Sequence, residues 1–383
     1  RRLQLSVSGP PEGYSYRMTT ENMTRSWTID LASDTATKPS AAMLAAMAAA
    51  DVGDEQRGED RTTTALCERV ADLLGMEAAV FLPSGTMCNQ IAFLVHCRPG
   101  DEIVTAANAH VFSSEGAGAA ALAGAQFSTI ATANGLFSAE DVRAALRKPR
   151  HRSPRSRVVS VEQTSNRGGG TVWPLAKLAD IRDVALSHGL LAHMDGARLP
   201  NAAVASGRPM HEHSRGYDSA WIDLSKGLGC PVGAVLAGSK GFIEEAWYWK
   251  HRLGGAMRQS GYLAAAGLFA LEHNYERLAL AHQNARLLAG LVSGAGGAAV
   301  SPTAGDTTIP FIALPNAVET NILFIDLSNC AIDADTVAER LSEHGIRLGV
   351  ENPRRMRAVT HLDVDTGQIR EAASRLAEIL TTG

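Results

Sequence analysis

Strand-like and helix-like segments alternate along this chain from residue 29 onward. The helix-like segments, among them TTTALCERVADLLG and AKLADIRDVALSHG, repeat apolar residues at the spacing of one helix face. The strand-like runs are short and mostly apolar: AAVFLP, DEIVTA, RVVSVEQ, LLAHMD, SAWIDLS and AVLAG. Regular succession of strand, helix and strand is typical of a parallel sheet with helices on both faces, so we predict the α/β class.

The alternation weakens near residue 262, which indicates a second structural unit. A long helical stretch follows, and beyond it come the runs TNILFIDL and RAVTHLDVD with further helical segments. A chain of 383 residues is also too long for one small core. We therefore expect a large domain over residues 29–275 and a smaller C-terminal α+β domain over residues 276–383. Residues 1–28 show no clear period, and we interpret them as an N-terminal extension without an assigned function.

Charge and cysteine content argue against several classes of protein. The formal net charge of -4 disfavours a nucleic-acid-binding protein. None of the five cysteines forms a CxxC pair, which argues against a disulfide framework or a metal site and favours the cytoplasm. No apolar run reaches the roughly 18 residues of a membrane span, and no signal-peptide core follows the first two arginines. The basic, proline-containing run at 147–157 predicts a loop that is solvated or lies at an active-site rim.

Small polar residues follow the run AAVFLP. In α/β sheets ligands bind at the carboxyl ends of the strands, so residues there are candidates for function. Ser84, Gly85 and Thr86 open a helical segment at such an end. Free N–H groups, two hydroxyls and the positive end of the helix dipole suit a phosphate group. The same residues would equally serve as an ordinary N-cap of the helix.

Two charged residues end other apolar runs. Asp195 ends LLAHMD, although a lone aspartate there is usually a turn former. Lys226 follows SAWIDLS, and of the six lysines it alone is flanked on both sides by residues that we expect to be buried. A buried ammonium without a partner is costly, so we expect its charge to be suppressed or its amine to be covalently engaged. Together with residues 84–86, these side chains meet the needs of pyridoxal 5'-phosphate: a lysine, a carboxylate for the ring nitrogen and a phosphate site.

A series of longer motifs runs in order through nearly the whole chain from residue 29: IDLASDTATKPS, GDEQRGED, LPSGTMCNQ, ANAHVF, VEQTSN, HMDGARL, LSKGLGCPVGAVLAG, LGGAMRQSG, ETNILFIDL and RAVTHLDVD. By these motifs the chain resembles the threonine aldolase family of fold-type I pyridoxal phosphate enzymes. The resemblance implies a carbon–carbon lyase, an aldehyde-lyase of threonine catabolism. Such an enzyme cleaves a β-hydroxy-α-amino acid to glycine and an aldehyde by a retro-aldol reaction.

The resemblance also assigns roles to individual residues. By it, Lys226 forms the Schiff base, Asp195 pairs with the ring nitrogen, and residues 84–86 hold the phosphate. His110 stacks on the cofactor ring, and Arg198 lies between the cofactor hydroxyl and the substrate carboxylate. The remaining matches are Ser33 and Arg357, which bind that carboxylate, and Arg258, which reaches a cofactor phosphate across a subunit interface. A homodimer or homotetramer with shared active sites is therefore expected.

The sequence leaves two questions open: which residue is the general base, and which side chain the substrate carries. His110 is the first candidate for the base and His151, in the basic loop, is the second. The chain departs from the family pattern at several positions, including Ala32, Gln56 and Cys88. Arg57 replaces a tyrosine that lies near the cofactor, so we hypothesise a more cationic pocket that prefers an acidic or aryl side chain.

Two other functions stay open. A related pyridoxal phosphate enzyme could eliminate at Cβ, as a dehydratase or β-lyase, and would release a keto acid and ammonia. A non-catalytic interaction module is the second alternative, but it would need neither Lys226 nor Asp195 nor a phosphate site.

Overall fold

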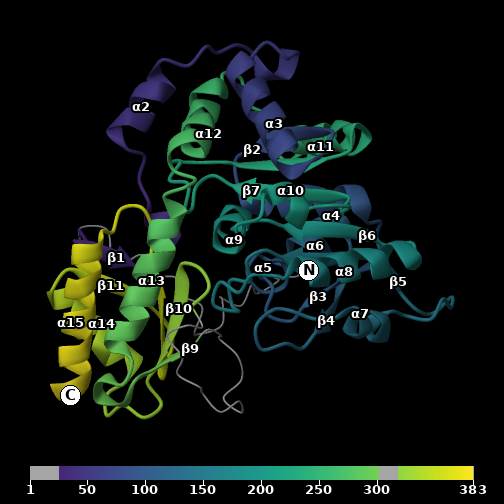
Figure 1. Cartoon of the computed structure of the whole chain (residues 1–383). Helices are drawn as coiled ribbons and strands as arrows, with labels where there is room; N and C mark the ends of the chain where they lie inside the picture. The colour runs from purple at the N-terminus through teal and green to yellow at the C-terminus, as the bar shows by residue number, and fades with distance from the viewer. Residues whose placement is uncertain (1–25, 302–317, 383) are drawn as a thin grey trace, which may run out of the picture.

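The computed structural model describes residues 26–301 and 318–382, so the predicted extension at 1–28 lies almost wholly outside the described residues. The described chain forms two sheets, each with its own hydrophobic core, and helix α13 (Leu278–Val292) leads from the larger unit along the smaller one (Figure 1). Among the described residues, no helix combines the length and the apolar character that crossing a lipid bilayer requires.

The larger sheet has seven strands in the order β2-β8-β7-β6-β5-β3-β4. Strand β8 runs antiparallel to both of its neighbours, and the other pairs are parallel. The strands are β2 (Ala78–Leu82), β3 (Asp101–Ala106), β4 (Gln126–Ile130), β5 (Arg155–Glu162), β6 (Leu191–Asp195), β7 (Ser219–Asp223) and β8 (Ala234–Gly238). Every residue of β3, β7 and β8 is buried, which explains why these runs are not interrupted by polar residues at alternate positions.

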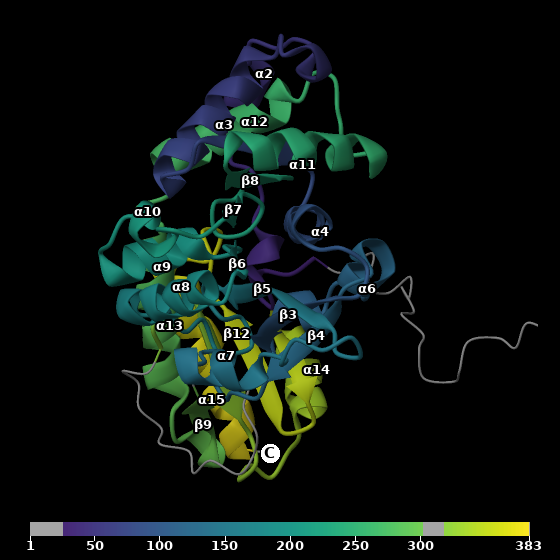
Figure 2. The ribbon, with the colours of Figure 1, turned by 90° about the vertical axis from the view of Figure 1, so that its right-hand side faces the viewer.

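Helices cover both faces of this sheet, with α4 and α6 on one side and α8, α9 and α10 on the other (Figure 2). The predicted α/β class is confirmed. The helices of this part are α2 (Ala41–Ala48), α3 (Arg61–Leu74), α4 (Gly85–His96), α5 (His110–Ser113), α6 (Gly118–Ala123), α7 (Ala139–Ala145), α8 (Leu175–Ser187), α9 (Leu199–Ser206), α10 (Met210–His213), α11 (Lys240–Arg252) and α12 (Gly261–His273). Their ends follow local chemistry: the Asp60 carboxylate caps the first turn of α3, and Gly75 ends that helix with a φ of 63°.

The smaller sheet has five strands in the order β1-β11-β12-β10-β9. Its elements are β1 (Ile29–Leu31), β9 (Ala299–Ser301), β10 (Ile322–Asp326), β11 (Ile346–Asn352) and β12 (Arg355–Val359), with helices α13 (Leu278–Val292), α14 (Ala334–Glu343) and α15 (Thr366–Thr382). We expected the large domain to begin at residue 29, and this is wrong for the first strand. Strand β1 pairs in parallel with β11, and Ile29 and Leu31 belong to the core of the smaller unit.

The long helical stretch predicted after residue 262 is two helices. The chain turns between α12 and α13, where the Asn274 side chain donates to the carbonyl of Leu228 at 2.8 Å. Leu278, at the start of α13, packs in the core of the large sheet, whereas Leu288 and Val292 pack in the core of the small one. Helix α13 therefore belongs to both units and fixes their relative position.

Candidate active site

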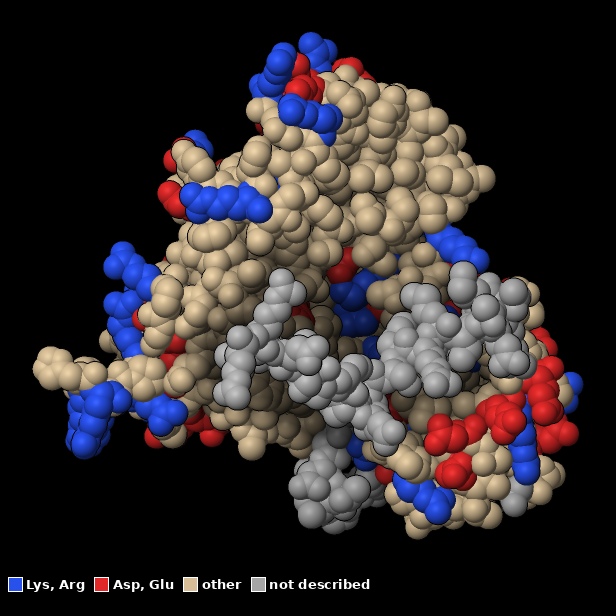
Figure 3. Space-filling view, turned by 180° about the vertical axis from the view of Figure 1, so that it is seen from behind, with Lys and Arg blue, Asp and Glu red and all other residues tan. Residues whose placement is uncertain are grey.

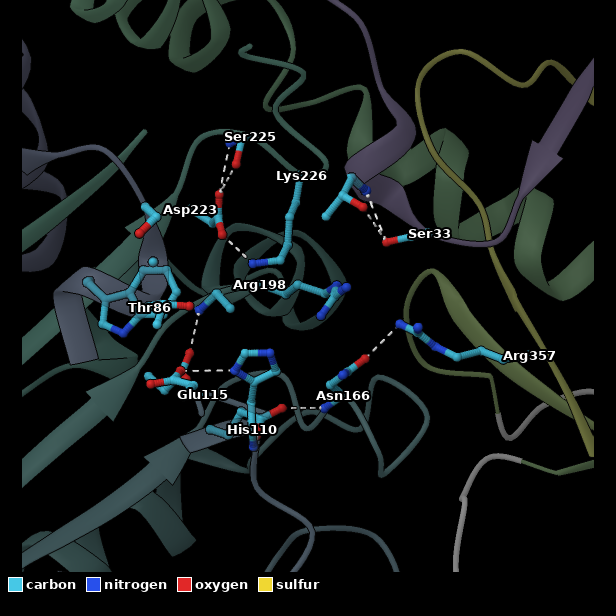
Figure 4. A pocket seen from close by; sticks show the side chains of 17 residues that line it. Ser33, Thr86, His110, Glu115, Asn166, Arg198, Asp223, Ser225, Lys226 and Arg357 are labelled. Carbon is cyan, nitrogen blue, oxygen red and sulfur yellow. Dashed lines mark hydrogen bonds and ion pairs between the residues drawn. The ribbon is translucent and has the colours of Figure 1, made fainter. Parts of the chain in front are cut away.

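One cavity of about 350 Å³ collects the polar residues from the carboxyl ends of the large sheet (Figure 4). The strands contribute in turn: β2 leads to residues 84–86, β3 to His110, β6 to Asp195 and β7 to Lys226. The small unit contributes Arg357 from β12, and residues 33 and 35 follow β1. In the space-filling view a hollow with charged side chains set back inside it opens between the upper and lower parts of the molecule (Figure 3).

The N-terminus of α4 forms a floor of small residues in this cavity. The Ser84 hydroxyl accepts from the backbone N–H of Met87 at 3.2 Å, so it caps the helix and also lines the cavity. A Cβ atom on Gly85 would lie 2.2 Å from the Trp221 ring, so only glycine fits there. The predicted N-cap is therefore present, and the exposed N–H groups and the Thr86 hydroxyl fit a phosphate group.

Lys226 lies at the centre of the cavity and has a partner that the sequence analysis missed. Its Nζ contacts the carboxylate of Asp223, which also accepts from the backbone N–H and hydroxyl of Ser225 at 2.9 and 2.8 Å. The Lys226 side chain is 19% exposed. Lys226 is therefore paired, and its predicted covalent engagement does not follow from an unpaired buried charge. The fully buried lysine is Lys250, which pairs with Glu55 and whose pKa is lowered by burial to about 7.

Asp195 is buried beneath the cavity in a group of acidic residues. Its carboxylate accepts from the Asn89 amide at 2.9 Å and from the backbone N–H of Ala197 at 3.0 Å. Burial, followed by the negative charges of Glu162 and Glu115, raises the pKa of Asp195 to about 7. A cationic N–H donor placed against Asp195 would offset this cost, so the residue fits a protonated pyridine nitrogen.

His110 begins α5 at the edge of the same acidic group. Its Nδ1 lies 2.9 Å from Glu115, and its backbone N–H donates to Glu162 at 2.7 Å. The hydrogen bond to Glu115 raises the pKa of His110 above its usual range, although burial opposes this. Neither carboxylate was predicted, because no fixed spacing joins Glu115 or Glu162 to His110 in the sequence. The SSEG segment, which directly follows ANAHVF, was the available signal for Glu115.

Two arginines face the cavity, and in the described part of the chain only one of them is paired with a carboxylate. Arg198 is 4% exposed and binds Asp34 through two hydrogen bonds of 2.7 Å. Burial alone would raise the pKa of the Asp34 carboxyl, but the Arg198 guanidinium holds it well below its usual range. Arg357 donates to Asn166 at 2.7 Å, and its Nε has no hydrogen-bond partner among the described residues although it is buried.

Because Asp34 already neutralises Arg198, Arg357 is the cation left to bind an incoming carboxylate. Burial, followed by the charge of Arg198, lowers the pKa of Arg357 to about 10, and an anionic ligand would reverse that effect. Ser33 also lines the cavity that Arg198 and Arg357 face, and its hydroxyl accepts from the backbone N–H of Thr35 at 3.2 Å. The sequence analysis named Ser33, Arg198 and Arg357 but missed Asp34.

Three predicted site residues do not line this cavity. His151 is exposed in the turn before β5, a strand of 8 residues whose far end carries Glu162, so the two ends lie roughly 26 Å apart. Within its own chain, His151 is therefore too far from the cavity to act as the base, and the basic loop does not border it. Its exposure agrees with the solvated loop that the sequence predicted as one alternative. Arg57 and Arg258 are exposed, and both pair with Asp54, at 3.7 and 2.8 Å.

Comparison with known proteins gives a consistent relationship. The sequence model described as "Beta-eliminating lyase" matches residues 30–315. Low-specificity L-threonine aldolase 1 of Arabidopsis thaliana is 36% identical over 92% of this chain and 97% of its own length. Low specificity L-threonine aldolase of Escherichia coli K12 is 38% identical over 90% of this chain and 97% of its own length.

Solved structures share the architecture. A threonine aldolase of Leishmania major superposes with a TM-score of 0.76 at 19% identity, over 92% of this chain and 99% of that one. A Thermus thermophilus aspartate aminotransferase superposes with a TM-score of 0.67 at 16% identity, over 94% of this chain and 93% of that one. The predicted fold-type I architecture is therefore confirmed, and the second match illustrates that this fold carries more than one reaction.

Proposed function

Because the chain belongs to the beta-eliminating lyase family, we propose that it is a pyridoxal phosphate-dependent aldehyde-lyase acting on β-hydroxy-α-amino acids of the threonine type. Its products are glycine and an aldehyde. The observation that carries the proposal is the convergence of Lys226, Asp195 and the α4 N-terminus on one cavity that also holds the Arg357 guanidinium, whose buried Nε has no hydrogen-bond partner among the described residues. Relatives named as low-specificity L-threonine aldolases, at 36% and 38% identity over at least 90% of the chain, support the reaction.

The residues that would hold the cofactor follow from the cavity. Ser84, Thr86 and the N–H groups of the α4 N-terminus would bind its phosphate, Asp195 its ring nitrogen, and the Lys226 amine its aldehyde carbon. When bound, pyridoxal phosphate supplies an electron sink for the bond that breaks at Cα.

The protein's own residues then orient the substrate and move its protons. Arg357 binds the substrate carboxylate through the planar guanidinium that suits this group. His110 accepts the proton of the β-hydroxyl at Nε2, because Nδ1 is held by Glu115. Glu115 stabilises the resulting imidazolium by its adjacent negative charge. Asp223 contacts Nζ of Lys226 and holds that side chain in the cavity.

We also propose a dimer or tetramer in which Arg57 and Arg258 complete a neighbouring cavity. Two observations support this: both side chains are exposed, at 72% and 61%, and neither lines the cavity of its own chain. In this arrangement Arg57 would influence the preference for the substrate side chain in the cavity of the partner subunit, not in its own. Turnover of threonine, phenylserine and 3-hydroxyaspartate by the wild type and by Arg57→Tyr tests it, and an unchanged order of preference contradicts it.

All five cysteines are free, which supports the proposed cytoplasmic location.

Product analysis tests the reaction. Purified protein incubated with pyridoxal phosphate and L-threonine is expected to release glycine and acetaldehyde in equal amounts, and Lys226→Ala is expected to release neither. β-Elimination is the second candidate, favoured by the description of the matched family. It would release a keto acid and ammonia, so finding those products in place of glycine would refute the aldolase reading.

A further inference from the structure

A chain of buried hydrogen bonds lies behind the acidic residues of the cavity, and Asn89 of α4 is its first member. Asn89 is fully buried, and its amide makes four contacts. Nδ2 lies 2.9 Å from Asp195 and 2.7 Å from Glu115. Oδ1 lies 2.7 Å from Nε1 of Trp221 and 3.0 Å from Nε2 of His193. All of the hydrogen-bonding capacity of the amide is therefore used.

The direction of these bonds is set by the chemistry of the partners. The indole Nε1 of Trp221 can only donate, so the Asn89 atom that faces it must be the carbonyl oxygen. The NH₂ group then faces Asp195 and Glu115, whose carboxylates accept from it. Two carboxylates that would otherwise repel each other thus share the two hydrogens of one amide.

The same reasoning extends through the sheet to the far end of α4. His193 must donate from Nε2 to Asn89, which leaves Nδ1 to accept from the hydroxyl of Ser219 at 2.8 Å. That oxygen in turn accepts from Nε2 of His96 at 2.7 Å. Burial lowers the pKa of both His193 and His96 to about 3, so both rings are neutral and each has one N–H to give.

We propose that Asn89 is a positioning residue that keeps Asp195 ionised for the ring nitrogen of the cofactor. His193, Ser219 and His96 form the chain behind it, and every donor in that chain points toward the carboxylates. Aligned hydrogen bonds polarise one another, so the Asn89 amide is a stronger donor than an isolated one. This inference rests on the proposed function, because it needs the ring nitrogen to lie against Asp195.

The need for such a donor follows from what faces Asp195. Glu162 and Glu115 carry like charges, and His110 carries the opposite one when it is protonated. Burial also favours the neutral carboxyl, which could not hold a cationic ring nitrogen. The Asn89 amide and the backbone N–H of Ala197 are the donors to the Asp195 carboxylate among the described residues, and of the two only the Asn89 donor can be removed by a side-chain substitution.

The test reads the ring nitrogen directly. Wild-type protein is loaded with pyridoxal phosphate labelled with ¹⁵N in the ring, and the nitrogen chemical shift is followed as a function of pH. Asn89→Leu removes the donor with little change of shape and is expected to lower the midpoint of ring-nitrogen protonation by about one pH unit or more. Ser219→Ala breaks the chain further back and is expected to cause a smaller shift in the same direction.

Asn284→Leu is the matched control, because Asn284 is a buried asparagine on α13 that bonds Val364 and Thr366 and lies outside the cavity. It is expected to leave the titration unchanged. A titration of Asn89→Leu that matches the wild type, or a ring nitrogen that is neutral in the wild type, overturns the inference while the cofactor is still bound. A wild type that binds no labelled cofactor overturns the proposed function and this inference together.

If Asn89→Leu does not fold, Ser219→Ala and the wild type still decide the matter. The proposed chain of hydrogen bonds requires both His193 and His96 to be neutral with the proton on Nε2. The ¹⁵N shifts of histidine rings distinguish this tautomer from the one with the proton on Nδ1. A proton on Nδ1 of His193 contradicts the direction of the chain. An unshifted titration in Ser219→Ala contradicts its influence on Asp195.

Discussion

Replacing Asp34 by asparagine is expected to destabilise the protein strongly, because it breaks an ion pair that joins the two units. Asp34 follows β1 of the small sheet, and Arg198 lies at the start of α9 on the large one. Their side chains are 0% and 5% exposed, and two hydrogen bonds of 2.7 Å connect them. Asn321, just before β10, donates to the same carboxylate at 3.1 Å.

The magnitude follows from burial and from what is left behind. Asp34→Asn keeps the size of the side chain but leaves the Arg198 guanidinium buried beside a neutral group. Removing one partner of a buried pair costs about 3–5 kcal/mol in the free energy of unfolding. The pKa of Asp34 is lowered in the folded state, so its contribution to stability is fully present above pH ~4, the usual carboxyl pKa, and is lost as the pH falls through the lower folded value.

Urea denaturation at pH 7 measures the change, with Glu140→Gln as the control. Glu140 pairs with Arg143 at 3.1 Å on the surface, where the side chains are 80% and 50% exposed, and pairs of that kind contribute at most about 1 kcal/mol. The substrate KM of Asp34→Asn should also change, because a second unpaired cation then faces the cavity. A loss below about 1 kcal/mol, equal to that of the control, would refute the view that this pair joins the two units.

Three further experiments address the cavity. Gly85→Ala is expected to cost about 1–3 kcal/mol in stability and to weaken cofactor binding more than tenfold, as measured by spectroscopic titration, because its methyl group meets a ring; normal binding would contradict the steric argument. Glu115→Gln removes the partner that raises the pKa of His110, so the acid limb of the kcat/KM profile should move to lower pH; an unmoved limb would exclude His110 as the base. Mixing inactive Lys226→Ala and Arg258→Ala proteins is expected to restore activity, because a shared site leaves one cavity of a mixed dimer intact, and absence of rescue would contradict the shared site.

The residues at the carboxyl ends of the strands could be predicted from the sequence, because each stands directly after an apolar run. Apolar runs predicted the buried strands, and Asp195 and Lys226 follow directly from where those runs stop. Asp223 could not be assigned in the same way, because one acidic residue inside a buried run gives no indication of its partner. Asn89 was hidden for a similar reason, since its importance depends on side chains from β6 and β7 that only the fold brings together.

Long-range pairing accounts for the other errors. Strand β1 looks like the start of the large domain because its sequence neighbours belong there, but its hydrogen-bonding partner β11 lies near the other end of the chain. The burial of Lys250 depends on Glu55, which comes from a distant turn. His151 was placed by a motif distance along the chain, and the direction of β5 carries it to the opposite end of the sheet.

The pairing of β1 with β11 has a consequence for how the protein is made. During synthesis the large sheet can assemble as its strands emerge, since its parallel pairs join elements that are near in sequence. Ser33 and Asp34, in contrast, take their positions only when β11 and β12 have left the ribosome, and β12 also brings Arg357. A truncated chain would therefore have the reactive lysine but no receptor for a substrate carboxylate. Amino-acid binding thus becomes a late event that reports on completion of the whole polypeptide.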